Sequence, residues 1–166
     1  YLQIKESFCK NKEMYYFCGI INQLTKYMEV KIKKLNENAV IPQYAHPTDA
    51  GLDLVAVSKS KDKDGNFVYG TGLAFEIPEG FVGLVFPRSS VSARCMTMAN
   101  CVGVIDSGYI GEVTVKFRQH LFAKPYDKGD RVAQMIIMPY PHIDFVEVDE
   151  LSESERGDGG YGSTGK

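Results

Sequence analysis

Cysteine and histidine are too few and too scattered in this sequence to build a metal centre. The 166 residues contain four cysteines and three histidines, with neither metal-type spacing nor the density of a disulfide framework. We therefore expect no zinc site and no disulfide scaffold, and we interpret the chain as a reduced, intracellular protein of the cytoplasm. These residues are Cys9, Cys18, Cys95, Cys101, His46, His120 and His142.

An excess of positive charge and a long hydrophobic run are also missing. The net charge of −2 argues against a nucleic-acid or membrane-surface binder, which would carry a basic excess. The apolar run from Met14 to Ile21 is too short to span a bilayer, and it lacks the small-residue cleavage site of a signal peptide. We therefore expect no membrane partner and no stable nucleic-acid partner.

Residues 1–27 differ in character from the rest of the chain. Three interpretations stay open: a short helix packed on the domain, a disordered arm, or residues that precede a natural start at Met28. We expect a protein that begins at Met28 to be folded and fully functional.

The sequence does contain many short strand patterns separated by turn signals. The 16 glycines and turn clusters at roughly eight- to twelve-residue spacing favour an all-β sandwich, jelly roll or barrel. Asp64-Gly65 predicts a hairpin turn, and Ser89 to Arg94 is the one short helix expected near the middle. Strands are expected at 29–35, 50–54, 73–77, 81–86, 101–105, 110–117, 131–138 and 144–148.

The stretch from Asn100 to Val113, NCVGVIDSGYIGEV, predicts a β-hairpin with turn residues at its centre. Asp106 would stand where the first strand ends, and Tyr109 would follow three residues later. Such a hairpin can place an amide, a carboxylate and an aromatic ring around one small cavity. The alternative is purely structural, because Asp and Gly are good turn residues and Tyr is a good strand residue.

Two other stretches carry candidate binding groups. Arg88 followed by Ser89 and Ser90 puts a cation and hydroxyls at the start of a short helix, which suits an anion. The alternative is an N-capping serine beside a solvated arginine. Gln134 lies within an apolar strand, where its amide must pair with backbone or with a ligand.

After Val148 the chain has few large apolar residues, and we interpret it as a flexible tail. Its glycines match the spacing of a dinucleotide-binding fingerprint and most of a P-loop, but we expect neither fold, because both need a helix after the motif and we expect none here. They still allow close approach of backbone donors to a phosphate chain. Arg156 adds a fork-shaped cation, and the ring of Tyr161 could stack on a base.

Five separated stretches resemble, in order, the five sequence motifs of the trimeric dUTPase family. The resemblance implies a distorted jelly-roll-like β-barrel that forms a homotrimer with composite active sites. It also implies hydrolysis of dUTP to dUMP and pyrophosphate with Mg²⁺ as cofactor. The stretches are Ala50 to Leu54, Pro87 to Ser90, Gly103 to Val113, Gly129 to Gln134, and Arg156 to Gly165.

The resemblance also implies roles for individual residues. Asp106 would polarise the attacking water, and Asp53 would hold the metal through water. Tyr109 would lie under the deoxyribose and leave no room for a 2′-hydroxyl. The domain would span 28–150, and the arm 151–166 would close over the site of a neighbouring subunit. Uracil would contact Asn100, Gly103, Val104 and Ile105, phosphates would contact Arg88, Ser89, Ser90 and Gln134, and the arm would contribute Arg156, Tyr161, Gly162, Ser163 and Thr164.

Two departures from the family pattern and two alternative functions accompany this prediction. Tyr161 stands where the family usually has Phe, and the stretch from Val91 to Ala99 lacks a glycine often seen there. A dCTP deaminase shares the fold, although it needs a further carboxylate near the base. A nucleotide-sensing interaction protein could use the same fold to bind a partner.

Overall fold

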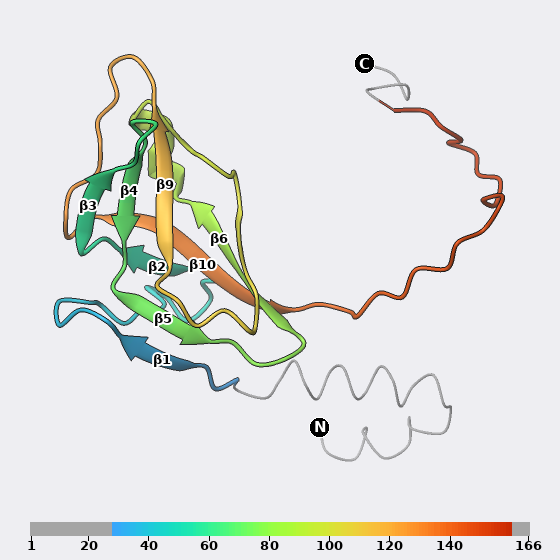
Figure 1. The fold of residues 1–166 in the computed structure, drawn as a ribbon, viewed down its shortest axis with the longest axis horizontal. Coiled ribbons are helices and arrows are strands. Elements are labelled where there is room, and N and C mark those ends of the chain that lie inside the picture. The colour runs from blue at the N-terminus through green and yellow to red at the C-terminus, as the bar shows by residue number, and fades with distance from the viewer. Residues whose placement is uncertain (1–27, 161–166) are drawn as a thin grey trace.

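The computed structural model describes residues 28–160, and its regular secondary structure is almost wholly short β-strands (Figure 1). Two four-stranded sheets have the strand orders β2-β10-β6-β8 and β3-β4-β9-β7, and β1 pairs with β5 in a two-stranded ribbon. Within the described residues, no helix is long and apolar enough to cross a membrane. The strands are β1 (Lys31–Lys34), β2 (Leu52–Val55), β3 (Ser58–Lys61), β4 (Phe67–Gly70), β5 (Leu73–Glu76), β6 (Phe81–Pro87), β7 (Met96–Met98), β8 (Gly103–Ile105), β9 (Thr114–Gln119) and β10 (Arg131–Pro139), and the 3₁₀ helix is η1 (Ser89–Ala93).

One apolar core joins the two larger sheets. In β9, Val115 and Phe117 are buried while Thr114, Lys116 and Arg118 are exposed, as expected for a strand with one covered face. Leu54 and Met135 of the other sheet belong to the same buried cluster. For residues 28–160 the all-β prediction is confirmed, and so is the short helix expected at Ser89 to Arg94, which spans Ser89–Ala93.

The hairpin predicted at Asp64-Gly65 is confirmed. It joins β3 to β4, and Gly65 adopts a φ of 80°, which glycine tolerates without strain. The carboxylate of Asp62 accepts hydrogen bonds from the backbone N–H of Asp64 and from Asn66. The hydrogen bond from the Asn66 side chain lowers the pKa of the Asp62 carboxyl. The turn is therefore held by its own side chains.

The hairpin predicted around Asp106 is wrong, because its two strands do not pair with each other. β8 pairs with β6 in one sheet, whereas β9 pairs with β4 and β7 in the other. Residues 106–113, the crossover segment, connect the two sheets. A hairpin loop usually has two to five residues, which this connection exceeds. A short apolar run predicted the first strand and a partly alternating pattern predicted the second, but neither pattern indicates which strand lies next to it.

Two further strand predictions need correction. Residues 144–148 were expected to form a strand, and the structure shows none there. Tyr140 donates its N–H to the Gly80 carbonyl, and the chain then leaves the body without a partner strand. Conversely, β7 at Met96–Met98 was not predicted, since its three residues are too short for a clear pattern.

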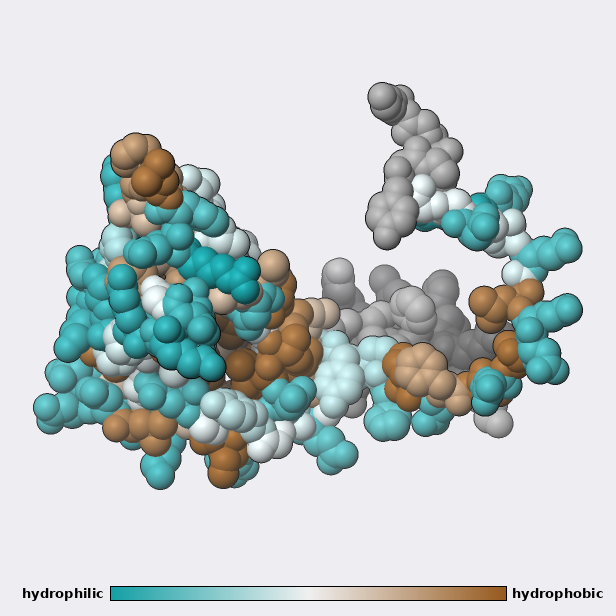
Figure 2. Space-filling view, turned by 45° about the horizontal axis from the view of Figure 1, so that its top comes forward, coloured by the Kyte–Doolittle hydropathy of each residue, from teal (hydrophilic) through white to brown (hydrophobic). Residues whose placement is uncertain are grey.

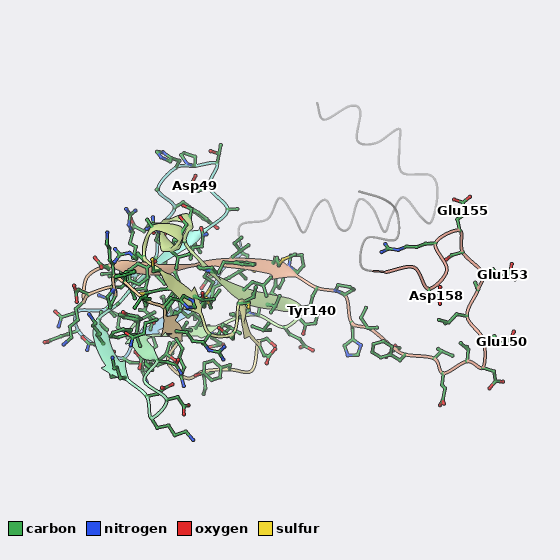
Figure 3. The ribbon with its side chains drawn as sticks, turned by 90° about the horizontal axis from the view of Figure 1, so that it is seen from above. Asp49, Tyr140, Glu150, Glu153, Glu155 and Asp158 are labelled. Atoms are coloured by element: carbon green, nitrogen blue, oxygen red, sulfur yellow. The ribbon has the colours of Figure 1, made fainter. Side chains whose placement is uncertain are left out.

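The segment after β10 extends away from the body of strands (Figure 1). Figure 3 shows Glu150, Glu153, Glu155 and Asp158 along it, far from the sheets. Apolar side chains lie between the charged ones, as Figure 2 shows. Within residues 28–160, no hydrogen bond joins residues 141–160 to the body. The exposed apolar residues of the segment are Ile143, Phe145, Val146, Val148 and Leu151.

An aromatic cluster closes one end of the core. The ring of Tyr126 lies 5.8 Å from that of Tyr69 and 5.5 Å from that of Phe117. The Tyr69 hydroxyl donates to the carbonyl of Tyr126, and burial raises the pKa of Tyr69 to about 12. The Tyr126 hydroxyl is buried and has no hydrogen-bond partner among the described residues.

Tyr126→Phe should therefore leave the protein equally stable or raise its free energy of unfolding by about 1 kcal/mol, because it removes an unpaired buried hydroxyl and keeps the ring. Tyr69→Phe is the matched control, and it should lower that free energy by about 1 kcal/mol because it removes a bonded hydroxyl. Urea unfolding of both variants measures the difference. A clear destabilisation by Tyr126→Phe would mean that its hydroxyl is satisfied.

Candidate active site

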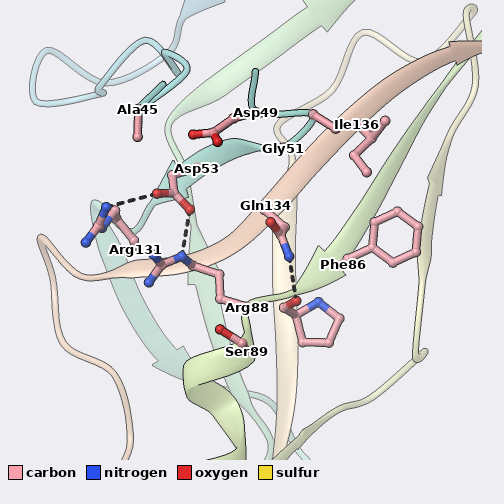
Figure 4. A pocket seen from close by; sticks show the side chains of 12 residues that line it. Ala45, Asp49, Gly51, Asp53, Phe86, Arg88, Ser89, Arg131, Gln134 and Ile136 are labelled. Atoms are coloured by element: carbon pink, nitrogen blue, oxygen red, sulfur yellow. Dashed lines mark hydrogen bonds and ion pairs between the residues drawn. The ribbon is translucent and has the colours of Figure 1, made fainter. Parts of the chain in front are cut away.

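A cavity of about 710 Å³ opens where β2, β6 and β10 come together (Figure 4). We call it the arginine pocket and define it by Gly51, Asp53, Arg88, Ser89, Arg131 and Gln134, which all line it. β10 pairs with β2 on one side and with β6 on the other, so this central strand holds both of its neighbours at the pocket. The residues that define the pocket come from three separate sequence motifs, Ala50 to Leu54, Pro87 to Ser90 and Gly129 to Gln134.

Asp53 holds two arginines at the wall of this pocket. Its Oδ1 accepts a hydrogen bond from Arg88 Nε at 2.6 Å, and its Oδ2 accepts one from Arg131 Nη1 at 3.1 Å. The side chains of Asp53 and Arg88 are only 24% and 25% exposed, so the pair is partly shielded from water. Because Arg88 uses Nε on Asp53, its two terminal nitrogens stay available for an anion.

Gln134 is oriented by backbone, one of the two options that the sequence left open. Its Nε2 donates to the Pro87 carbonyl at 3.1 Å. The amide lies directly against Gly51, where an added Cβ would be 2.6 Å from Gln134 Oε1. Glycine at position 51 therefore leaves room for the Gln134 amide in this orientation, a close approach that no sequence pattern indicates.

The two serines expected near the arginine follow it directly at the start of η1. Ser89 and Ser90 are exposed at the first turn of η1, and Ser89 lines the pocket. Arg88 stands at the N-cap position, and no side chain caps the helix. The alternative of a capping serine beside a solvated arginine is therefore wrong, since Arg88 is paired with Asp53.

A second group of predicted residues lies at the opposite end of β6. Ile105 pairs with Gly83, so Asp106 stands beside Val82, whereas Arg88 lies six residues further along the strand. At about 3.3 Å per residue, roughly 20 Å separates Asp106 from Arg88 within one chain. The structure thus brings the phosphate candidates together and keeps the catalytic candidate apart from them.

Tight packing of the backbone holds the residues that are predicted to contact uracil. Gly103 is buried, and a Cβ there would lie 3.2 Å from the Val85 Cβ. The Asn100 carbonyl accepts the N–H of Val102, and Cys101 adopts a φ of 59°. Asn100 is exposed, as is Val104 at the middle of β8.

Tyr109 is fixed within the crossover segment. Its N–H bonds the Asp106 carbonyl across a turn, and its hydroxyl donates to the Glu112 carbonyl at 3.0 Å. The ring covers Gly111, where an added Cβ would be 2.6 Å from the hydroxyl oxygen. With 45% of its surface exposed, Tyr109 is accessible to a ligand.

Comparison with known proteins identifies the family of this chain. The family model described as dUTPase matches residues 37–165. Deoxyuridine 5′-triphosphate nucleotidohydrolase from Nautilia profundicola is 44% identical over 142 residues, which cover 84% of this chain and 100% of that protein. The protein of the same name from Thermobifida fusca is 42% identical over 142 residues, covering 83% of this chain and 79% of that protein. The chain belongs to the dUTPase family.

Solved dUTPases share the fold of this dUTPase-family chain. The dUTPase of Staphylococcus bacteriophage 80alpha with dUPNHPP matches with a TM-score of 0.72 at 30% identity, covering 83% of this chain and 99% of that one. A mutant dUTPase from phage phi11 of S. aureus, described with a structural Mg(II) ion, has a TM-score of 0.62 at 26% identity, covering 74% and 98%. These matches, with the two facing sheets, confirm the jelly-roll-like fold.

The donor set of this dUTPase suits a metal ion that arrives with a phosphate chain. Among residues 28–160, no group of three or more His, Cys, Asp or Glu side chains could hold a metal ion by itself. Both oxygens of Asp53 already accept hydrogen bonds from guanidinium groups. Mg²⁺ commonly keeps several waters and uses one or two carboxylates plus substrate phosphates, so contact with Asp53 through water fits this geometry.

Of the arm residues predicted to contact the nucleotide, only Arg156 lies within the described residues. Arg156 is exposed, and its Nε donates to the Gly159 carbonyl at 3.0 Å. The other arm residues that were predicted to contact the nucleotide lie outside the described residues; they are Tyr161, Gly162, Ser163 and Thr164.

Gly51→Ala should weaken binding of the analogue dUPNHPP by about tenfold or more, because small misplacements of binding groups carry such penalties. The added methyl would collide with Gln134 Oε1 and turn the amide away from the Pro87 carbonyl. Isothermal titration calorimetry measures the dissociation constant. Gly65→Asn in the β3–β4 turn is the control and should bind normally; equal affinity of the two variants would remove Gly51 from the site.

Proposed function

We propose that this dUTPase hydrolyses dUTP to dUMP and pyrophosphate at a site completed by two copies of the chain. The observation that carries the proposal is the separation of about 20 Å between Asp106 and Arg88 along β6. A water attacking the α-phosphorus must lie close both to its base and to the bound phosphates. One copy therefore supplies the arginine pocket, and a second copy supplies the Asp106 turn.

The reaction follows from the groups that meet at this junction. Asp106 accepts a proton from a water whose oxygen forms a new bond to the α-phosphorus. The bond between that phosphorus and the oxygen bridging to the β-phosphorus breaks, and pyrophosphate leaves with the electron pair. The terminal nitrogens of Arg88 and the hydroxyls of Ser89 and Ser90 hold the charged oxygens in place. Gln134 contributes its amide, which is oriented by the Pro87 carbonyl.

Mg²⁺ bound with the triphosphate would neutralise charge on the phosphate oxygens. Asp53 would contact its hydration shell while continuing to orient Arg88 and Arg131.

Recognition of the nucleoside is assigned to the strand and turn around Asp106. Asn100 and the backbone of Gly103, Val104 and Ile105 read the uracil edge by hydrogen bonds. Tyr109 lies under the deoxyribose and leaves no space for a 2′-hydroxyl. A dCTP deaminase is set aside, because the matching family and its named relatives are dUTPases.

A homotrimer with exchanged arms accounts for the segment after β10. Its apolar residues are exposed, Phe145 at 94%, and would be covered by a neighbouring copy. An arm that leaves its own body can deliver residues 151–166 to another subunit's site. Arg156, Tyr161, Gly162, Ser163 and Thr164 would then close over the nucleotide.

Asp106→Asn tests the catalytic role of Asp106. The change keeps the size of the side chain and removes the proton acceptor, so kcat for dUTP should fall by about two to four powers of ten. Affinity for dUPNHPP should stay within about twofold, since no phosphate contact is lost. Glu79→Gln, at an exposed carboxylate beyond β5, is the control. Turnover at the parental rate would assign the base elsewhere.

Mixing two inactive variants tests whether copies share the site. Refolding equal amounts of Asp106→Asn and Arg88→Ala together should restore roughly a quarter of the sites. Half of the pockets then contain Arg88, half of the turns contain Asp106, and each site combines a pocket and a turn from different subunits. The measurement is pyrophosphate release from dUTP, with each variant refolded alone as the control. Absence of recovery from mixed oligomers, verified by co-purification of two tags, would place both groups in one copy.

A further inference from the structure

Glu112 lies in the crossover segment and bonds to two different parts of the molecule. Its side chain reaches back to the turn before β5, where Oε1 accepts the N–H of Gly72 at 2.8 Å. Its backbone carbonyl accepts the hydroxyl of Tyr109 at 3.0 Å. Glu112 thus connects the rigid core with the aromatic ring assigned to the sugar.

The turn that Glu112 contacts is held firmly in place. Gly72 adopts a φ of 66°, and a Cβ there would lie 2.8 Å from the Asn36 Cβ and 2.9 Å from Val57 Cγ2. Thr71 is fully buried, and its Oγ1 donates to the Val113 carbonyl at 2.8 Å. The N–H of Val113 donates to the Leu73 carbonyl at 2.9 Å.

The opposite end of this connection determines where the Tyr109 ring lies. Its hydroxyl bonds the Glu112 carbonyl, and its ring covers the Gly111 backbone. A shift of the Glu112 backbone would therefore move the ring. The carboxylate bond to Gly72 opposes such a shift, because it ties residue 112 to a turn that is packed on all sides.

We propose that Glu112 is a positioning residue for sugar selectivity. Its carboxylate fixes the backbone that holds Tyr109, and thereby keeps closed the space that a ribose 2′-hydroxyl would need. Rejection of one extra hydroxyl depends on leaving it neither space nor partner. The inference rests on the proposed role of Tyr109 in the dUTP site.

The test compares kcat/KM for dUTP with kcat/KM for UTP in the full chain. Glu112→Ala should lower this ratio by about tenfold, mainly by raising hydrolysis of UTP, because the ring is no longer fixed. Glu112→Gln keeps an oxygen acceptor for the Gly72 N–H, so its ratio should stay within about twofold of the parent. Glu37→Ala, at an exposed glutamate in the loop after β1, is the matched control and should not change the ratio.

Tyr109→Ala separates failure of this inference from failure of the proposed function. If Tyr109→Ala lowers the ratio and Glu112→Ala does not, the role of Glu112 is wrong. If neither changes the ratio, Tyr109 does not read the sugar, and both assignments fall. A loss of thermal stability in Glu112→Ala with an unchanged ratio would make Glu112 purely structural. If Glu112→Ala fails to fold, the same ratio of kcat/KM values is measured for Glu112→Asp, whose side chain is one methylene shorter.

Discussion

The pairing of β10 with both β2 and β6 is the constraint on which the candidate site depends. Asp53 and Gln134 are direct neighbours across β2 and β10, and Gln134 faces Phe86 across β10 and β6. This register places Arg88 beside a carboxylate that lies 35 residues earlier in the chain. A slip by one residue would turn every side chain to the opposite face of the sheet and dismantle the pocket.

β6 also separates the two halves of the site. Its end at Pro87 leads into the arginine pocket, while its beginning pairs with β8 and carries the Asp106 turn beside it. A short, straight strand cannot bring its two ends together. In the proposed site a second copy of the chain supplies the missing half, so that assembly becomes part of the chemistry.

Under the proposed roles of Tyr109 and Glu112, residues of the crossover segment serve both the fold and sugar selectivity. It must leave one sheet and enter the other, and its bonds to the turn before β5 secure that passage. A further bond, from the Tyr109 hydroxyl to the Glu112 carbonyl, holds the Tyr109 ring in place. Changes that loosen the connection between the sheets should therefore also change which sugar is accepted.

The sequence by itself determined the all-β class, most strand positions, the Asp64-Gly65 hairpin and the short helix, because these depend on local alternation and turn chemistry. The family motifs also identified most candidate site residues before any contact was known. Only the tertiary structure decided that β8 and β9 lie in different sheets, that residues 144–148 have no partner strand, and that Gly51 contacts Gln134. The physical reason is that strand pairing and close approach depend on residues distant in the chain, which a local pattern does not encode.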